Sequence, residues 1–194
     1  AEQSGFITEI GFEMYHKILD EALHELRETE FRDLYEKEKP EEYIRECQLE
    51  TDLELLIPDD YVSSISERLI LYKELDNIED EEWLMKYLER MIDRFGPIPP
   101  QVDGLINAVR VRWLARQNGF EKVILKNGRL TGHFVSNQES DYYNSERFSR
   151  VLDYVKRNPR HCRLKETQSR LTLAIEPIGS VFEALEFLRN IKGE

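Results

Sequence analysis

Cysteine is scarce in this sequence, and its scarcity excludes two classes of protein. The 194 residues contain only Cys47 and Cys162, which lie far apart and outside any Cys-x-x-Cys pair. Disulfide-stabilised domains and zinc modules need several cysteines at short spacings. We therefore expect two unpaired thiols in a reducing, cytoplasmic environment.

Long apolar runs and motifs for enzyme chemistry are also lacking. No stretch approaches the roughly 20 apolar residues of a membrane helix, and 34 % of the residues are charged. There is no glycine-rich phosphate-binding loop. The first residues, Ala1 to Gly5, carry neither a basic nor an apolar segment. We therefore expect no signal peptide, no membrane partner, and a piece of a longer protein.

Three potential metal ligands, His16, Asp20 and His24, recur at four-residue steps on a predicted helix. The two histidines would lie two turns apart, about 12 Å, whereas ligand bonds are about 2 Å long. Because one ion cannot bridge that distance, we interpret all three as surface residues.

The adjacent residues His161 and Cys162 have the types of a base and a nucleophile. Neither a second acid nor an oxyanion-hole pattern accompanies them, and His133 belongs to a different predicted ribbon. Neighbouring acids are usually solvated, and we interpret the remaining pairs in this way: Asp59, Asp60, Glu81 and Glu82. We expect no catalytic residues in this chain.

Negative charge is concentrated at the start of the chain. Of the net −12, residues 1–56 contribute −11, with 17 acidic and 6 basic residues, and residues 57–194 contribute −1. This shift predicts a boundary near residue 57. Residues 110–170 carry 14 basic against 6 acidic residues, an excess that favours phosphate or an acidic protein surface. A solvated mixed surface is the alternative.

The first 56 residues predict one helix, a charged connector and one strand. Apolar residues recur at helical steps over 11–26, charged residues dominate 27–46, and apolar residues alternate with acidic ones over 49–57. A lone strand must join a sheet, either in missing upstream chain or in the second part of this chain.

The second part predicts helices around two hairpins. Ser64 caps a helix with Ile65, Leu69, Tyr72 and Leu75 inward, Asp80 caps a helix that ends at Gly96, and Pro99 and Pro100 begin a third. Asn127-Gly128 signals a hairpin with a type I′ turn. A helix capped by Ser145, a ribbon formed by 161–165 and 170–175, and a helix capped by Ser180 follow. The expected fold is α+β, with helices packed on small antiparallel hairpins rather than parallel crossovers.

Three spaced motifs carry a family resemblance. They are Ile57-Pro58-Asp59-Asp60-Tyr61, then Arg68-Leu69 with Tyr72-Lys73, then Ile92-Asp93-Arg94-Phe95-Gly96 followed by Pro99. In this order they resemble the C-terminal end of the bacterial transcription-repair coupling factor (Mfd) family. The stretch from Gly5-Phe6 to Met14-Tyr15 is similar to the tail of that family's second translocase lobe. The resemblance implies a translocase-lobe tail over 1–56, a linker and connecting helix over 57–78, and the C-terminal domain over 79–194.

What the resemblance implies is a non-catalytic, autoinhibitory domain of an ATP-driven DNA translocase. Such a parent displaces stalled RNA polymerase and recruits the nucleotide-excision-repair protein UvrA. In this family the C-terminal domain docks on a UvrB-like N-terminal domain and masks the UvrA-binding surface. The expected partners are that domain and the translocase lobe, and indirectly UvrA, RNA polymerase and DNA. ATP and magnesium would belong to the parent, so we expect no cofactor in this chain.

The same resemblance singles out an interdomain interface. Asp93 and Arg94 occupy positions that the family uses at this contact, where a carboxylate and a guanidinium make charge-assisted hydrogen bonds. Arg90 departs from the family, which often has Glu there, and Glu89 is the candidate replacement. The alternatives are a reversed local ion-pair pattern or an exposed helix-end ion pair worth about 0–1 kcal/mol.

A second hypothesis is a nucleic-acid-binding accessory domain. It would use the basic stretch 110–170, with four aromatic residues for base stacking, Phe134, Tyr142, Tyr143 and Phe148.

Overall fold

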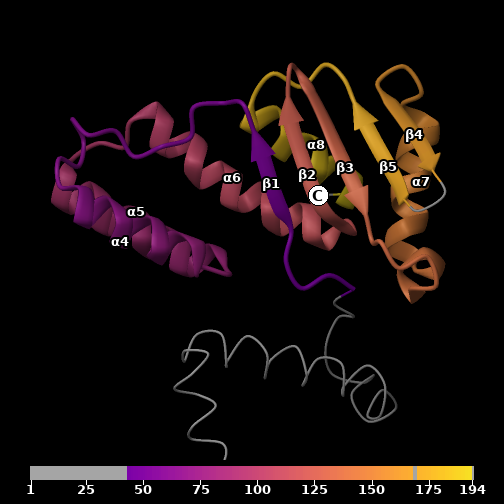
Figure 1. Ribbon diagram of the computed structural model, residues 1–194, viewed down its shortest axis with the longest axis horizontal. Coiled ribbons are helices and arrows are strands. Elements are labelled where there is room, and N and C mark those ends of the chain that lie inside the picture. Colours follow the sequence, from indigo (N-terminus) through magenta and orange to yellow (C-terminus); the bar gives the residue numbers. More distant parts are fainter. Residues whose placement is uncertain (1–42, 168–169, 194) are drawn as a thin grey trace, which may run out of the picture. The chain divides into compact units, whose positions relative to one another are not determined.

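The chain divides into two compact units, Ala1–Glu41 and Glu42–Glu194. The computed structural model describes residues 43–167 and 170–193, all in the second unit (Figure 1). The helix predicted over 11–26, with His16, Asp20 and His24, lies outside the described residues. The second unit begins before the shift in charge at residue 57, since the composition of a segment does not determine which core it packs into. Ile44 and Cys47 are both buried in that core.

Five strands form one mixed sheet in the order β1-β2-β3-β5-β4. They are β1 (Gln48–Thr51), β2 (Phe120–Lys126), β3 (Arg129–Phe134), β4 (Cys162–Thr167) and β5 (Arg170–Ile175). All neighbours pair antiparallel except β1 and β2, which are parallel. The α+β class is confirmed, and the strand expected over 49–57 joins the sheet of the second part of the chain, one of the two alternatives. Its parallel pairing with β2 was not expected. Turn motifs identify local pairs, whereas the β1–β2 and β3–β5 pairings join segments far apart in sequence.

The predicted turn and its register are confirmed. Asn127 and Gly128 have φ values of 53° and 71°, and a type I′ turn requires positive φ at both positions. Leu125 lies opposite Leu130, and Val123 lies opposite Gly132. A two-residue loop thereby fixes which residues of β2 and β3 share a face.

The helices begin where the sequence predicts. They are α4 (Ile65–Asp76), α5 (Glu81–Phe95), α6 (Pro100–Gln117), α7 (Glu146–Arg157) and α8 (Val181–Lys192), with a 3₁₀ turn η1 (Asp141–Asn144) before α7. Each predicted cap side chain accepts a bond from a backbone N–H in the first turn, and these caps are Ser64, Asp80, Ser145 and Ser180. Within the described ranges, no helix has both the length and the apolar character needed to cross a membrane.

Two apolar clusters form the interior, and α6 contributes to both. Val102, Ile106 and Val109 join α4, α5 and the segment around Ile57. Further along α6, residues such as Val111 and Leu114 join the sheet, α7 and α8. The molecule therefore has a helical half built on the α4–α5 hairpin and a sheet half.

The buried side of α4 differs from the prediction. Leu71 and Leu75 are buried, but Ile65 and Leu69 are 69 % and 64 % exposed. Apolar residues occur all around this helix, so helical spacing alone does not select the face that packs.

Candidate docking site on the α4–α5 hairpin

Helices α4 and α5 form an antiparallel hairpin held by cross-helix contacts. The hydroxyl of Tyr87, which is 1 % exposed, donates to the Leu71 carbonyl at 3.2 Å. At the open end of the hairpin, the hydroxyl of Tyr61 donates to the Gly96 carbonyl at 2.9 Å. Gly96 has φ 89° and ends α5, as the sequence predicts. These bonds fix which residues of α5 face α4.

Two of the four predicted interface residues lie against α4. Arg90 forms an ion pair with Glu74, and Arg94 forms one with Glu67. The Arg94 guanidinium carbon also lies 4.9 Å from the centroid of the Phe95 ring. The two arginine side chains remain 58 % and 56 % exposed, and ion pairs of this kind contribute at most about 1 kcal/mol. Arg90 therefore has a partner within the hairpin, which accounts for a basic residue at that position.

The other two residues are free. Asp93 and Glu89 lie one helical turn apart on the exposed side of α5. In the described part of the chain, neither carboxylate has a cation within ion-pair distance. The structure thus separates the predicted set into two arginines paired across the hairpin and two carboxylates that face solvent.

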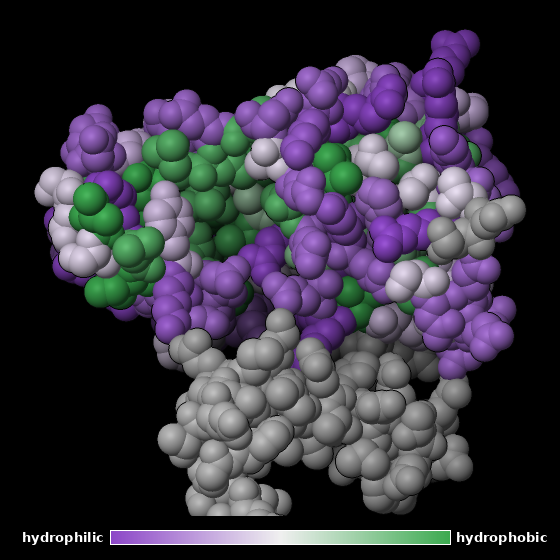
Figure 2. Space-filling view, viewed as in Figure 1, coloured by the Kyte–Doolittle hydropathy of each residue, from purple (hydrophilic) through white to green (hydrophobic). Residues whose placement is uncertain are grey.

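Exposed apolar side chains concentrate on the same hairpin. Of the eight exposed large hydrophobic residues among those described, six lie on α4 and α5, namely Ile65, Leu69, Ile70, Trp83, Met85 and Ile92. Figure 2 shows green surface over the region where Figure 1 draws these helices. Ile92 directly precedes Asp93. Apolar residues occur on more sides of α4 than one buried face requires, and this excess could have indicated the surface. We instead predicted that Ile65 and Leu69 point into the core.

Comparisons with known proteins agree with this fold and with the motifs on the hairpin. Residues 51–145, which include α4 and α5, match the family model of the TRCF domain. The chain carries a TRCF domain. The Escherichia coli K12 transcription-repair-coupling factor is 28 % identical over 166 residues, covering 84 % of this chain and 13 % of that protein. Its Rickettsia bellii counterpart is 27 % identical over 192 residues, covering 98 % and 16 %.

A solved structure extends the comparison. The crystal structure of the C-terminal domain of transcription-repair coupling factor superposes with a TM-score of 0.55 at 20 % identity, covering 76 % of this chain and 94 % of that one. It supports the same fold for the TRCF domain described here. The chain spans only 13–16 % of the length of the relatives named above.

In the described part of the chain, the residues considered for catalysis do not form a hydrogen-bonded base and nucleophile. His161 Nδ1 lies 3.0 Å from the Glu176 carbonyl, Cys162 is buried, and burial raises the pKa of its thiol. His133 lies on β3 and has no hydrogen-bond partner among the described residues. No group of three or more potential metal ligands occurs in the described ranges either. Nothing in these parts of the chain forms a nucleophile or a metal centre.

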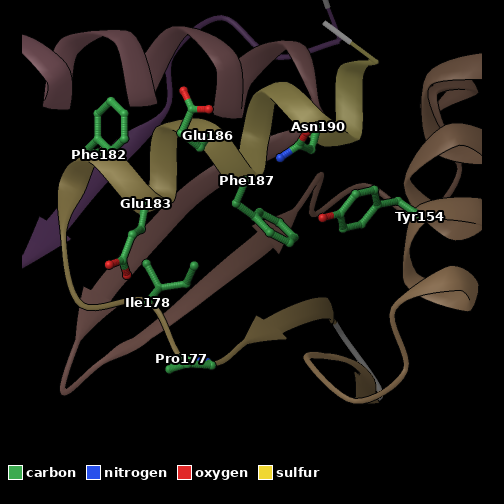
Figure 3. A pocket seen from close by; sticks show the side chains of 8 residues that line it. All are labelled: Tyr154, Pro177, Ile178, Phe182, Glu183, Glu186, Phe187 and Asn190. Carbon is green, nitrogen blue, oxygen red and sulfur yellow. The ribbon is translucent and has the colours of Figure 1, made fainter.

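A shallow cleft of about 290 Å³ lies between α7, α8 and the segment after β5 (Figure 3). Tyr154, Ile178 and Phe187 provide apolar walls. Its acids already have partners, because Glu183 accepts from the Gly179 N–H at 2.7 Å and Glu186 pairs with Arg189 at 2.9 Å. The cleft therefore has apolar walls, and its two acids are already engaged by the Gly179 N–H and Arg189.

The aromatic residues proposed for base stacking are core residues. Phe134 and Tyr142 are 1 % and 0 % exposed, and the Phe148 ring centroid lies 5.7 Å and 5.4 Å from theirs. The Tyr142 hydroxyl donates to the Asn118 carbonyl at 2.5 Å, and Tyr143 packs 5.1 Å from Phe148. Because these rings pack on one another, that part of the nucleic-acid hypothesis was wrong.

Proposed function

We propose that this chain is the autoinhibitory C-terminal domain of a transcription-repair coupling factor, and that the α4–α5 hairpin is its docking surface. In the intact protein the hairpin covers a UvrB-like N-terminal domain and thereby masks the surface that binds UvrA. Release of this contact, when the translocase engages RNA polymerase on DNA, exposes that surface. The observation that carries the proposal is the concentration of exposed apolar side chains beside Asp93.

The composition of the hairpin surface suits a protein interface. Binding energy at interfaces concentrates in a few buried apolar, aromatic and arginine side chains within a polar rim. Met85 and Ile92 lie seven residues apart on one side of α5, and Ile65 and Leu69 lie four apart on one side of α4. These side chains can act as anchors, with charged residues around them.

Asp93 and Arg94 have different roles in this proposal. The free carboxylates of Asp93 and Glu89 can accept hydrogen bonds from cationic side chains of the partner. Such contacts contribute more to specificity than to affinity. Arg94 is already held by Glu67, so it aligns α5 on α4 and presents part of its guanidinium outward. Arg90 does the same through Glu74.

The experiment uses the full-length parent protein and measures UvrA binding. Reversing the charges with Asp93→Arg and Arg94→Asp should break the docked state and raise UvrA affinity about five- to hundredfold, the usual range of allosteric coupling. Ile92→Asp should act in the same direction. Phe182→Asp is the matched control, because Phe182 is 61 % exposed on α8 and should leave UvrA affinity unchanged.

A charge swap separates the two roles of Arg94. Glu67→Arg with Arg94→Glu preserves the cross-helix ion pair and reverses the charge that a partner meets. Increased UvrA binding in the swap assigns Arg94 to the interface, whereas wild-type binding leaves Arg94 as a structural residue. Unchanged UvrA binding in both the Asp93→Arg, Arg94→Asp variant and Ile92→Asp would contradict the docking surface.

We further expect that ATP hydrolysis and its magnesium belong to the parent translocase. The isolated chain should then show no ATP turnover, with or without DNA. Measurable ATPase activity in the purified chain would contradict its assignment as a non-catalytic domain.

A further inference from the structure

One face of the sheet is not covered by any described helix. α6, α7 and α8 pack on the face that carries residues such as Val123, Leu130 and Leu173. In Figure 1 the strands lie in front of these helices, and Figure 2, from the same direction, shows mainly hydrophilic surface there. We call this side the open sheet face.

The strand registers place polar side chains in one row across the open sheet face. Lys165 pairs with Thr172, Thr172 with His133, His133 with Lys122, and Lys122 with Gln48. Directly paired residues point to the same side of a sheet. Four inter-strand spacings of about 4.8 Å make the row roughly 19 Å long. Lys165, Lys122 and Gln48 carry donor groups, whereas the Thr172 hydroxyl already donates to the Lys165 carbonyl at 3.2 Å.

Positive charge is unevenly compensated along this face. At the β1 end, Glu50 accepts from Lys122 at 2.5 Å and from Lys126 at 3.3 Å. At the β4–β5 end stand Arg163, Lys165 and Arg170, all exposed. Within the described ranges, no carboxylate lies within ion-pair distance of these three. An acidic chain of net charge −12 thus keeps a cluster of unpaired cations on one flat surface.

His133, in the middle of the row, has an unmet hydrogen-bonding capacity. Both ring nitrogens are inaccessible and have no partner among the described residues. Burial, followed by the charges of Arg170 and Lys122, lowers the pKa of His133. Its neutral ring can donate one bond and accept another. Because both nitrogens are inaccessible, the ring fills the middle of the row as a neutral group and does not itself reach a ligand.

The open sheet face lacks the anchors of a protein interface. The eight large hydrophobic residues exposed in the described part lie on α4, α5, α8 or, for Leu164, on the opposite side of β4. Arginine, lysine and threonine side chains are instead the usual contacts to phosphate oxygens. A regular polyanion fits this chemistry better than a folded protein surface.

We propose that the open sheet face binds the sugar–phosphate backbone of nucleic acid through Arg163, Lys165 and Arg170. Because no exposed aromatic ring lies on this face, binding does not read the bases. The proposal concerns a different surface from the docking hairpin and does not depend on the docking function.

The test measures fluorescence anisotropy of a labelled 20-base-pair duplex and of the equivalent single strand, with the 194-residue chain. Wild-type protein should bind both, with the duplex tighter because its phosphates are denser. Three phosphate contacts predict about a 40-fold loss of duplex affinity between 50 and 200 mM salt. Two duplexes of unrelated sequence should bind equally.

Two matched variants locate the surface. Arg163→Ala, Lys165→Ala and Arg170→Ala together should lower affinity at least tenfold at 50 mM salt and flatten the salt dependence by about three in log–log slope. Lys86→Ala, Lys156→Ala and Lys192→Ala remove the same charge from α5, α7 and α8 and should change affinity less than threefold. Circular dichroism establishes that both variants fold.

Three results would overturn the proposal. The first is no binding by wild-type protein at 50 mM salt. The second is an equal loss in the two triple variants, which would reduce the effect to net charge. The third is a polyglutamate peptide of equal charge that binds as tightly as the duplex, which would assign the face to an acidic protein segment.

Discussion

The α4–α5 hairpin and the open sheet face carry opposite kinds of surface on the second unit of the chain. The hairpin exposes apolar side chains, and two of its arginines, Arg90 and Arg94, are paired with Glu74 and Glu67. The open sheet face is polar, and its cations at β4 and β5 have no acidic partner among the described residues. Apolar anchors favour a protein partner and unpaired cations favour phosphate. A segment rich in basic residues therefore need not form a basic surface, because ion pairs with acidic side chains neutralise some of its charges and leave others exposed.

The largest expected effect is a loss of stability on replacing glycine by alanine, which we compare between one glycine of the sheet half and one of the helical half. Gly119 and Gly96 both have positive φ, 90° and 89°. A Cβ at Gly119 would lie 2.0 Å from the Tyr142 ring, whereas one at Gly96 would have no atom within 4 Å. Both Gly→Ala changes introduce backbone strain of about 1–3 kcal/mol, and Gly119→Ala adds about 1–3 kcal/mol of overpacking. Urea denaturation should therefore find Gly119→Ala the less stable variant. Equal losses would contradict the packing around Tyr142.

A smaller effect tests the interior of the hairpin. Tyr87→Phe removes the hydroxyl that donates to the Leu71 carbonyl and keeps the ring. The free energy of unfolding should fall by about 0.5–1.5 kcal/mol, the net value of a typical hydrogen bond. Tyr72→Phe, which removes the hydroxyl bonded to the Ile57 N–H, is the comparison outside the α4–α5 contact. A loss well above 2 kcal/mol for Tyr87→Phe would mean that the ring also repacks.

The next effect is smaller still and concerns the exposed ion pairs. A double-mutant cycle with Glu67→Ala and Arg94→Ala should give a coupling free energy of about 0–1 kcal/mol that decreases with salt. The same cycle on Glu81 and Arg110, where Arg110 Nε lies 3.0 Å from Glu81 Oε2 and its side chain is 19 % exposed, should give a larger value. A coupling above 2 kcal/mol for Glu67 and Arg94 would argue that Arg94 serves stability rather than docking.

The smallest effect is expected for thiol labelling, where the Tyr87→Phe variant should behave like the wild-type protein. Cys47 and Cys162 both belong to the cluster of the sheet half, and burial raises the pKa of Cys47 to about 12. At pH 8 neither thiol should react with an aromatic disulfide reagent in the folded protein, since the thiolate is the reactive form. Tyr87→Phe should leave this protection intact if the halves open independently. Faster labelling in that variant would show that the hairpin and the sheet unfold together.

Local features of this fold follow from the sequence. Ser64, Asp80, Ser145 and Ser180 cap helices, and Asn127-Gly128 turns a hairpin, because each depends on the chemistry of a few neighbouring residues. The exposed side of α4 was predicted as core, since Ile65 and Leu69 follow a helical period that several faces of this helix share. The pairings of β1 with β2 and β3 with β5 also required the structure, because they join segments distant in the chain.

The candidate sites show the same division. Asp93, Arg94, Glu89 and Arg90 were selected by a motif, and their assignment to an interface remains a prediction. That Arg90 and Arg94 pair with α4, whereas Asp93 and Glu89 face solvent, depends on how two helices pack. Phe134, Tyr142, Tyr143 and Phe148 were selected for base stacking, but Phe134 and Tyr142 are buried and the other two rings pack against the same core.

The sequence is sufficient to predict the helix ends and the hairpin turn, because these depend on interactions within a few residues; its motifs and periodicity also predict the family and the α+β class. Only the tertiary contacts show that β1 pairs with β2 at the edge of the sheet, that Tyr142 is buried, and that Arg163, Lys165 and Arg170 have no acidic partner among the described residues. These outcomes depend on which distant segments come into contact, and the free energy of burying one side of a helix or sheet selects among many local possibilities.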